Sequence, residues 1–515
     1  MATTQPVDGD SAGTFLGHPK GLFVLFFAEM WERFSYYGMR ALLIFYLTKH
    51  WLFSDSDAGI IYGAYTALVY ITPVVGGYLA DKYLGQRKAV LFGAVLLTLG
   101  HFFMAFEGDP AAGTENNPIV YVFWLALALI IVGSGFLKAN ISVIVGQLYP
   151  RTDTRRDAAY TIFYMGINLG AAIGSLLCGY IGETYGWAYG FGLAGIGMLA
   201  GLVVFVWGKP LLLGRGEPPK QLAKKTEWSM YGVGIALVGV CWLAIQYQDM
   251  VGYVLGLFGG SLVLYVLFIA VVKLPSEERD RIFAAMFLIL TSIVFWALFE
   301  QAGSSLNLFT DRHVDRGGVP ASTFQSINAI YIILLASVFA VTWQTLGRKG
   351  LEPSAPLKFG LGIVQVGLGF LVLVWGAQSV GMDAAVPVLF IFLIYLLHTT
   401  GELCLSPVGL SAMNRLAPSH MASLIMGTWF FASATGNFAA GLIASATGAE
   451  GVGEEAGKQV VLDVYSTVGW YAIAIGVGVM VISPLIKKLM HLDTLQDDDV
   501  GDDLLGQSEG PGEPQ

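Results

Sequence analysis

The chain has 515 residues, of which 55% are hydrophobic and 13% are charged, against about 25% charged residues in an ordinary soluble protein. The formal net charge is -9, and basic patches with interleaved aromatic residues are absent from the sequence, so nucleic-acid binding is excluded. The three cysteines and seven histidines show no metal-ligand spacing. We therefore expect no metal site, no cofactor and no metal-dependent enzyme.

Apolar stretches long enough to cross a bilayer, which takes about 20 residues, recur along the chain. They predict fourteen transmembrane helices, near 20–47, 57–81, 88–106, 118–149, 157–182, 186–208, 228–248, 251–272, 282–303, 322–346, 358–378, 386–410, 420–446 and 463–486. A membrane barrel is excluded, because these stretches lack its alternation of polar and apolar residues. The predicted fold class is all-α membrane.

The spacing of the helices predicts a division of the chain into two six-helix bundles with a helix pair inserted between them. Two such halves are the plan of the major facilitator fold. The loop at 77–88 resembles the loop signature of that superfamily. The predicted parts are a cytoplasmic tail (1–19), the first bundle (20–208), a cytoplasmic linker (209–227), the inserted pair (228–272), the second bundle (273–490) and an acidic disordered tail (491–515).

The distribution of basic residues predicts the orientation in the membrane. Loops that carry many Lys and Arg residues stay in the cytoplasm. With both termini placed in the cytoplasm, most of the 28 basic residues fall on cytoplasmic connections. The outer loops then hold Lys49, Arg312, Arg316 and Lys458.

Seven ionisable residues lie inside predicted spans, where a charge is costly and is a functional candidate by default. They are Glu29, Glu32, Arg33, Arg40, Lys138, Glu300 and Glu402. Acids and bases are nearly balanced, so we expect them to pair. On a helical wheel Glu29, Arg33, Tyr36 and Arg40 share one face of the first span, with Glu32 and Tyr37 beside it, so that face looks into a cavity or a partner helix.

The depth of these residues predicts two pairs between the halves. Lys138 and Glu402 each lie 13 residues before a cytoplasmic arginine, at matching positions of equivalent helices. Arg40 and Glu300 lie nearer the outer face. We expect an outer gate pair, Arg40–Glu300, and an inner gate pair, Lys138–Glu402, that form alternately. The other interpretation is that both pairs are static and only stabilise the bundle.

Three motifs resemble those of the proton-dependent oligopeptide transporter (POT) family. The first-helix segment from Glu29 to Gly38, the segment from Phe163 to Gly170 and the segment from Gly401 to Pro407 occur in the order that this family shows. The resemblance covers about residues 17 to 490. It implies a major facilitator fold and symport of di- and tripeptides with protons.

The resemblance also implies roles for particular residues. Arg33 and Lys138 would face the peptide carboxylate, and Glu402 the peptide amino group. Asn168 and Asn328 would assist by hydrogen bonding, with Ser406 beside them. Proton coupling would rest on Glu29, Glu32 and Glu300. The side-chain pockets would be lined by Tyr36, Tyr37, Tyr70, Tyr164, Trp296 and Trp429.

The sequence departs from animal members of the family at one position. Their second-helix histidine corresponds to Gly63 here, while His101 and His398 are expected to be buried packing residues. Together with the short loop at 379–385 and the inserted pair, this indicates a bacterial inner-membrane protein, which we expect to function as a monomer. The alternatives are a carrier of nitrate or another small anion, a membrane enzyme and a channel. The acids at the predicted site argue against an anion carrier.

Overall fold

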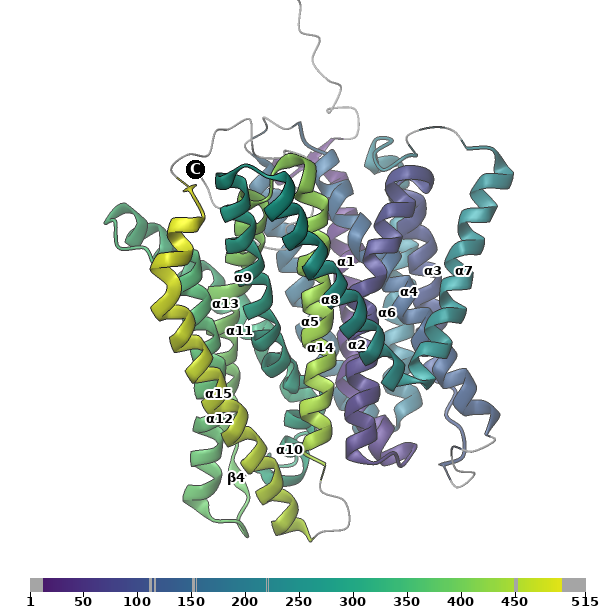
Figure 1. Ribbon diagram of the computed structural model, residues 1–515. Coiled ribbons are helices and arrows are strands. Elements are labelled where there is room, and N and C mark those ends of the chain that lie inside the picture. Colours follow the sequence, from purple (N-terminus) through teal and green to yellow (C-terminus); the bar gives the residue numbers. More distant parts are fainter. Residues whose placement is uncertain are drawn as a thin grey trace, which may run out of the picture.

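The computed structural model describes residues 13–110, 114, 117–150, 153, 155–218, 220, 222–448 and 453–492. The predicted acidic tail lies outside these residues from 493 onward, as do residues 1–12 of the predicted N-terminal tail. Figure 1 shows a bundle of long helices that run side by side from one end of the molecule to the other.

The N-terminal half contains six long helices. A small antiparallel hairpin of β1 (Thr14–Phe15) and β2 (His18–Pro19) precedes them. A π-helical turn, Tyr46–His50, follows the first of these helices, and another, Ala80–Leu84, follows the second. A short 3-10 helix, Lys209–Leu212, ends the half. The helices are α1 (Lys20–Phe45), α2 (Asp55–Leu79), α3 (Gln86–Met104), α4 (Pro118–Gln147), α5 (Arg155–Tyr185) and α6 (Trp187–Trp207).

The inserted pair consists of α7 (Lys224–Gln246) and α8 (Gln248–Lys273), which are separated by the single residue Tyr247. Helix α7 packs on α4, where Gly234 lies against the ring of Phe92 from α3. Helix α8 contacts both halves, α2 of the first and α9 and α14 of the second, where Gly252 lies against the ring of Phe438. Most of the surface of the pair is exposed, as a lipid-facing position requires.

The C-terminal half also contains six long helices, of which one is interrupted. Strands β3 (Val314–Asp315) and β4 (Val386–Pro387) pair in parallel, and short 3-10 helices cover Ala321–Gln325 and Ser419–Met421. The helices are α9 (Ser276–Phe299), α10 (Ser305–His313), α11 (Ser326–Arg348), α12 (Ala355–Val380), α13 (Leu389–Leu416), α14 (Ala422–Ala446) and α15 (Glu454–Leu489).

The interruption in α9 differs from the single span that the sequence predicts near 282–303. Helix α9 ends at Phe299, a 3-10 turn covers Glu300–Gly303, and Ser304 takes a non-helical conformation (φ -124°, ψ -101°) before the nine-residue helix α10. This short helix lies at the end of the bundle opposite the C-terminal end of α15 (Figure 1). We call this end the α10 end.

Twelve segments in the described part of the chain are long and apolar enough to cross a membrane. Helices α1 and α14 have similar lengths, 26 and 25 residues, and are not among these twelve segments. Helix α1 packs on α5 within the first half, and α14 packs on α2 across the boundary between the halves. Together with the twelve segments they make up the fourteen helices that the sequence predicts.

The two halves meet along two helix pairs, α2 with α14 and α5 with α11. The first contact is close, because a Cβ atom on Gly63 would lie 2.6 Å from the Cα atom of Gly441. Small residues let the two backbones approach in this way. Most residues of each apolar core belong to one half, and the first core also includes Leu308, Ala321 and Ala434 of the second half.

Candidate functional site

A cavity of about 1350 Å³, counted with the space where it opens to solvent, lies between the two halves. Helices α1, α2, α4 and α5 form one wall, and α9, α11, α13 and α14 form the other. The structure brings most of the predicted binding residues together on these walls. They are Arg33, Tyr37, Tyr70, Lys138, Tyr164 and Asn168 from the first half and Trp296, Asn328, Glu402, Ser406 and Trp429 from the second.

The first wall is cationic where α1 faces the cavity. Arg33 lines it, while Glu29 and Glu32 lie buried behind, with exposed fractions of 1% and 0%. The Arg33 Nε atom donates to the Glu29 carboxylate at 2.7 Å and lies 3.2 Å from the Glu32 carboxylate. Because two carboxylates share one guanidinium, protonation of either would change how firmly Arg33 is held.

Lys138 adds a second cation to this wall, from the middle of α4. Its ammonium lies 4.6 Å from the centre of the Tyr70 ring on α2. A cation–π contact of this kind holds a lysine side chain in place through the ring face. The ring therefore positions a second positive charge on the cavity wall that also carries Arg33.

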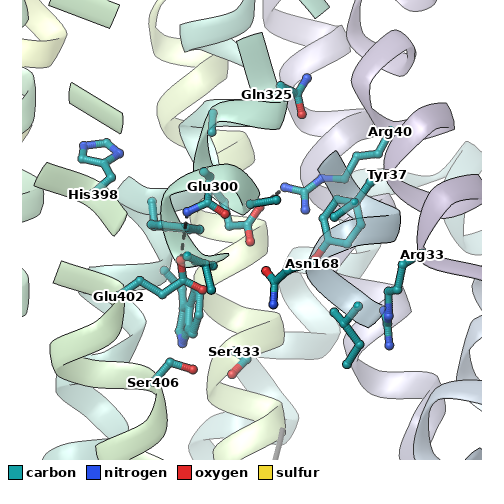
Figure 2. A pocket seen from close by; sticks show the side chains of 18 of the residues that line it. Arg33, Tyr37, Arg40, Asn168, Glu300, Gln325, His398, Glu402, Ser406 and Ser433 are labelled. Atoms are coloured by element: carbon teal, nitrogen blue, oxygen red, sulfur yellow. Dashed lines mark hydrogen bonds and ion pairs between the residues drawn. The ribbon is translucent and has the colours of Figure 1, made fainter. Parts of the chain in front are cut away.

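The opposite wall carries an acid, Glu402 on α13. The Asn328 side chain on α11 donates to its carboxylate at 3.0 Å and to the Thr399 hydroxyl at 3.0 Å. Figure 2 shows Glu402 and Arg33 on opposite sides of the cavity. Pro407 lies inside α13 one turn further on and cannot donate to the carbonyl of Leu403, so the helix is weakened close to the acid.

Arg40 and Glu300 form the predicted outer pair. The two side chains point toward each other across the cavity (Figure 2) and make a buried ion pair. The Arg40 Nε atom also donates to the Tyr62 hydroxyl at 2.5 Å. A Cβ atom on Gly303 would occupy the place of that hydroxyl, so glycine at this position is required by the close approach of the Tyr62 side chain.

Further contacts join the halves at the α10 end. Asn307 of α10 and Gln325 both donate to the Ala41 carbonyl oxygen, at 3.2 and 3.4 Å. The Glu183 carboxylate of α5 accepts from the backbone N–H of Ser322 at 2.7 Å. Two ion pairs, Arg312–Asp55 and Lys49–Asp311, lie outside these contacts. At this end the buried Arg40–Glu300 ion pair is therefore accompanied by hydrogen bonds and by two exposed ion pairs between the halves.

The opposite end holds ion pairs that stay within a half or its adjoining segments. Arg87 after the α2–α3 turn pairs with Glu217, and Lys358 of α12 pairs with Glu352. The hydrogen bond from the Arg87 guanidinium holds the pKa of the Glu217 carboxyl below its usual range. The Arg87 backbone N–H donates to Gly216, so the segment after α6 is fixed to the first half.

The predicted inner pair, Lys138–Glu402, is not formed in this structure. Within the described residues the Glu402 carboxylate interacts with Asn328 and makes no ion pair with Lys138. Only the outer member of the two predicted gate pairs is thus closed. This arrangement is the one that alternate formation of the pairs requires, and whether they alternate stays a prediction.

Two details of the site differ from the sequence prediction. Tyr36 does not line the cavity but is buried, with its ring edge against Tyr37, which does. His398 is buried as expected, and its ring also borders the cavity, between Phe370 and Phe299. The sequence prediction missed other cavity residues, among them Gln325, Tyr395, Phe430 and Ser433.

A family model and two known relatives match most of this chain. The model of the POT family matches residues 87–456. A peptide transporter of Yersinia enterocolitica is 39% identical over 459 residues, which are 84% of this chain and 88% of that protein. A di-/tripeptide transporter of Lactococcus lactis subsp. lactis is 32% identical over 450 residues, which are 82% of this chain and 88% of that protein.

A solved structure shows the same fold. The crystal structure of a mutant peptide transporter POT in complex with alafosfalin superposes with a TM-score of 0.80 at 36% identity. The match covers 93% of this chain and 97% of that one. It confirms the predicted major facilitator arrangement of the helices.

Proposed function

The chain belongs to the POT family, and on that premise we propose that it carries di- and tripeptides into the cell together with protons, by alternating access. It is a multi-pass membrane transporter and not an enzyme. The relatives described above transport peptides according to their names, and they cover most of this chain.

The observation that carries the proposal is the placement of opposite charges on the two walls of one cavity. Arg33 and Lys138 lie on the first wall and Glu402 on the second. A peptide has a carboxylate at one end and an ammonium at the other, whatever its side chains are. A guanidinium suits the carboxylate through paired donors, and a buried carboxylate suits the ammonium. An anion carrier would have no use for Glu402.

The remaining cavity residues support binding of varied peptides. Asn168 and Asn328 provide hydrogen bonds near the two charged groups, and Ser406 lies one turn beyond Glu402. Aromatic side chains accept apolar and polar peptide side chains alike, because they combine a large apolar surface with polar atoms. Those that line the cavity are Tyr37, Tyr70, Tyr164, Trp296 and Trp429.

Proton coupling follows from competition for the buried arginines. A peptide carboxylate that binds Arg33 competes with Glu29 and Glu32, and protonation of these acids frees the guanidinium for it. Protonation of Glu300 weakens its ion pair with Arg40 and lets the α10 end open. The three glutamates thus couple proton binding to peptide binding and to opening.

Orientation and location complete the proposal. The basic loops and both termini lie in the cytoplasm, so the α10 end faces outward and the structure is closed on the outer side. The protein resides in a bacterial inner membrane and functions as a monomer. We propose that the chain is divided as the sequence predicts, into two halves with an inserted helix pair between them.

Uptake in liposomes tests the proposal. We expect purified protein to accumulate labelled dialanine when an inward proton gradient is imposed, and an uncoupler to abolish the accumulation. Folded protein that takes up no di- or tripeptide would contradict the proposal and favour a small anion as substrate. Uptake that the uncoupler does not affect would support a peptide as the substrate but would contradict proton coupling.

A further inference from the structure

Thr399 lies three residues before Glu402 on α13 and is completely buried. It does not line the cavity, yet it is in contact with the site through Asn328. Its side chain therefore cannot touch a bound peptide, and any effect it has on binding must pass through Asn328.

The hydroxyl of Thr399 has a fixed role as hydrogen-bond acceptor toward Asn328. A threonine hydroxyl carries one hydrogen, and here it is donated to the Tyr395 carbonyl oxygen at 2.7 Å. Only lone pairs remain for Asn328. The amide nitrogen of Asn328, not its oxygen, must therefore face Thr399, as it does at 3.0 Å.

The same amide nitrogen is also bound to Glu402. Its second hydrogen is donated to the Glu402 carboxylate at 3.0 Å, so both hydrogens of the amide are used. Asn328 lines the cavity, and its side-chain oxygen is the polar atom that remains, with no hydrogen-bond partner among the residues that the structure describes. A hydrogen-bond acceptor thus lies beside a carboxylate.

We propose that Thr399 is a positioning residue for recognition of the peptide amino group, because it fixes the Asn328 amide with its oxygen toward the cavity. The inference rests on the proposed peptide transport. An ammonium group has three hydrogens to donate and accepts none, so it needs acceptors around it. Glu402 and the Asn328 oxygen provide two of them side by side. A reversed amide would turn its own hydrogens toward the ammonium.

Replacement of the hydroxyl by a methyl group tests this role. In Thr399→Val the Asn328 amide is held by Glu402 alone, and the peptide ammonium competes for that same carboxylate. We expect the KM for dialanine uptake in liposomes to rise about fivefold, the ratio that corresponds to one neutral hydrogen bond, with kcat unchanged. Thr399→Ser keeps the hydroxyl and is expected to restore the KM.

A ligand without the amino group separates positioning from a general loss of structure. N-propionylalanine is dialanine with the ammonium replaced by hydrogen. Its inhibition constant against dialanine uptake should be the same for the parent protein and for Thr399→Val. If both ligands weaken equally, or if the KM for dialanine does not change, the proposed role of Thr399 is wrong.

Thr400 provides a matched control on the same helix. Its hydroxyl donates to the Leu396 and Leu397 carbonyl oxygens, and it does not line the cavity. Thr400→Val makes the same chemical change one residue away and should leave the KM for dialanine unchanged. A parent protein that takes up no peptide would overturn the proposed function and this inference with it. If the parent takes up dialanine and Thr399→Val has the same KM as the parent, the inference is wrong and the proposed function stands.

Discussion

The two ends of the molecule are held by different kinds of contact. At the α10 end, Arg40–Glu300, Arg312–Asp55 and hydrogen bonds to the Ala41 carbonyl oxygen all join one half to the other. At the opposite end, Arg87–Glu217 and Lys358–Glu352 tie loops to the half beside them. Contacts of the first kind have to break when the halves rock, whereas contacts of the second kind can persist.

We propose that this difference separates charges that control movement from charges that support structure. Arg40 and Glu300 are buried, and a buried pair that loses one partner leaves a charge without compensation. Glu217 is 40% exposed, and exposed pairs contribute little. Removing one partner of an ion pair should therefore have a larger effect at the α10 end than at the opposite end.

The largest effect is expected from exchanging the charges of the unformed inner pair. In the double variant Lys138→Glu and Glu402→Lys an attraction between the walls remains possible, but each wall presents the wrong charge to a peptide. We expect the variant to fold and to lose dialanine uptake in liposomes. Full coupled uptake by the exchanged pair would show that the two residues have only a static structural role.

A smaller effect is expected at the formed outer pair. Glu300→Gln keeps a hydrogen-bond acceptor for Arg40 but removes the charge and the proton site. We expect accumulation driven by a proton gradient to fall about tenfold, in line with the loss of a charge-assisted hydrogen bond, while exchange of labelled for unlabelled dialanine continues. Equal loss of accumulation and exchange would mean that Glu300 is needed for binding or folding and not for coupling.

The smallest effect is expected at the opposite end, in Glu217→Gln. The pKa of Glu217 is lowered by the hydrogen bond from Arg87, so the ionised form stabilises the fold above the usual carboxyl range and the stabilisation is lost as pH falls through the lowered pKa. The parent should melt at a slightly higher temperature than the variant at pH 7. This difference should shrink in acid, with uptake unaffected. A variant with strongly reduced uptake would place this end among the moving contacts.

The charges of the site could be predicted from the sequence because a charge stands out in an apolar stretch. Arg33, Arg40, Lys138, Glu300 and Glu402 all border the cavity between the halves. Their burial is costly unless they are paired or face a cavity, which is the reason that their presence indicates a site. The number of spans could be predicted for a similar reason, because apolar stretches are separated by polar segments.

The residues that were missed or misplaced do not stand out in this way. Tyr36 and Tyr37 are adjacent, and a single helix does not reveal which of them faces the cavity; the packing of α1 against α5 decides it, for example where Gly38 meets Cys178. Ser433 and Phe430 are ordinary residues of a membrane helix. The end of α9 at Phe299 was also missed, because the sequence has no proline between Phe299 and Ser305 to mark the break.

The inserted helix pair has a mechanical consequence for movement between the halves. Helix α7 rests on the first half, where Gly234 meets Phe92, whereas α8 contacts α2 of the first half and also the second half, where Gly252 meets Phe438. The two helices are joined by the single residue Tyr247, so rocking of the halves is transmitted to this short connection. Relative movement of the halves then has to be taken up in the backbone at Tyr247 or by sliding at the contacts of α8, of which Gly252 with Phe438 is one.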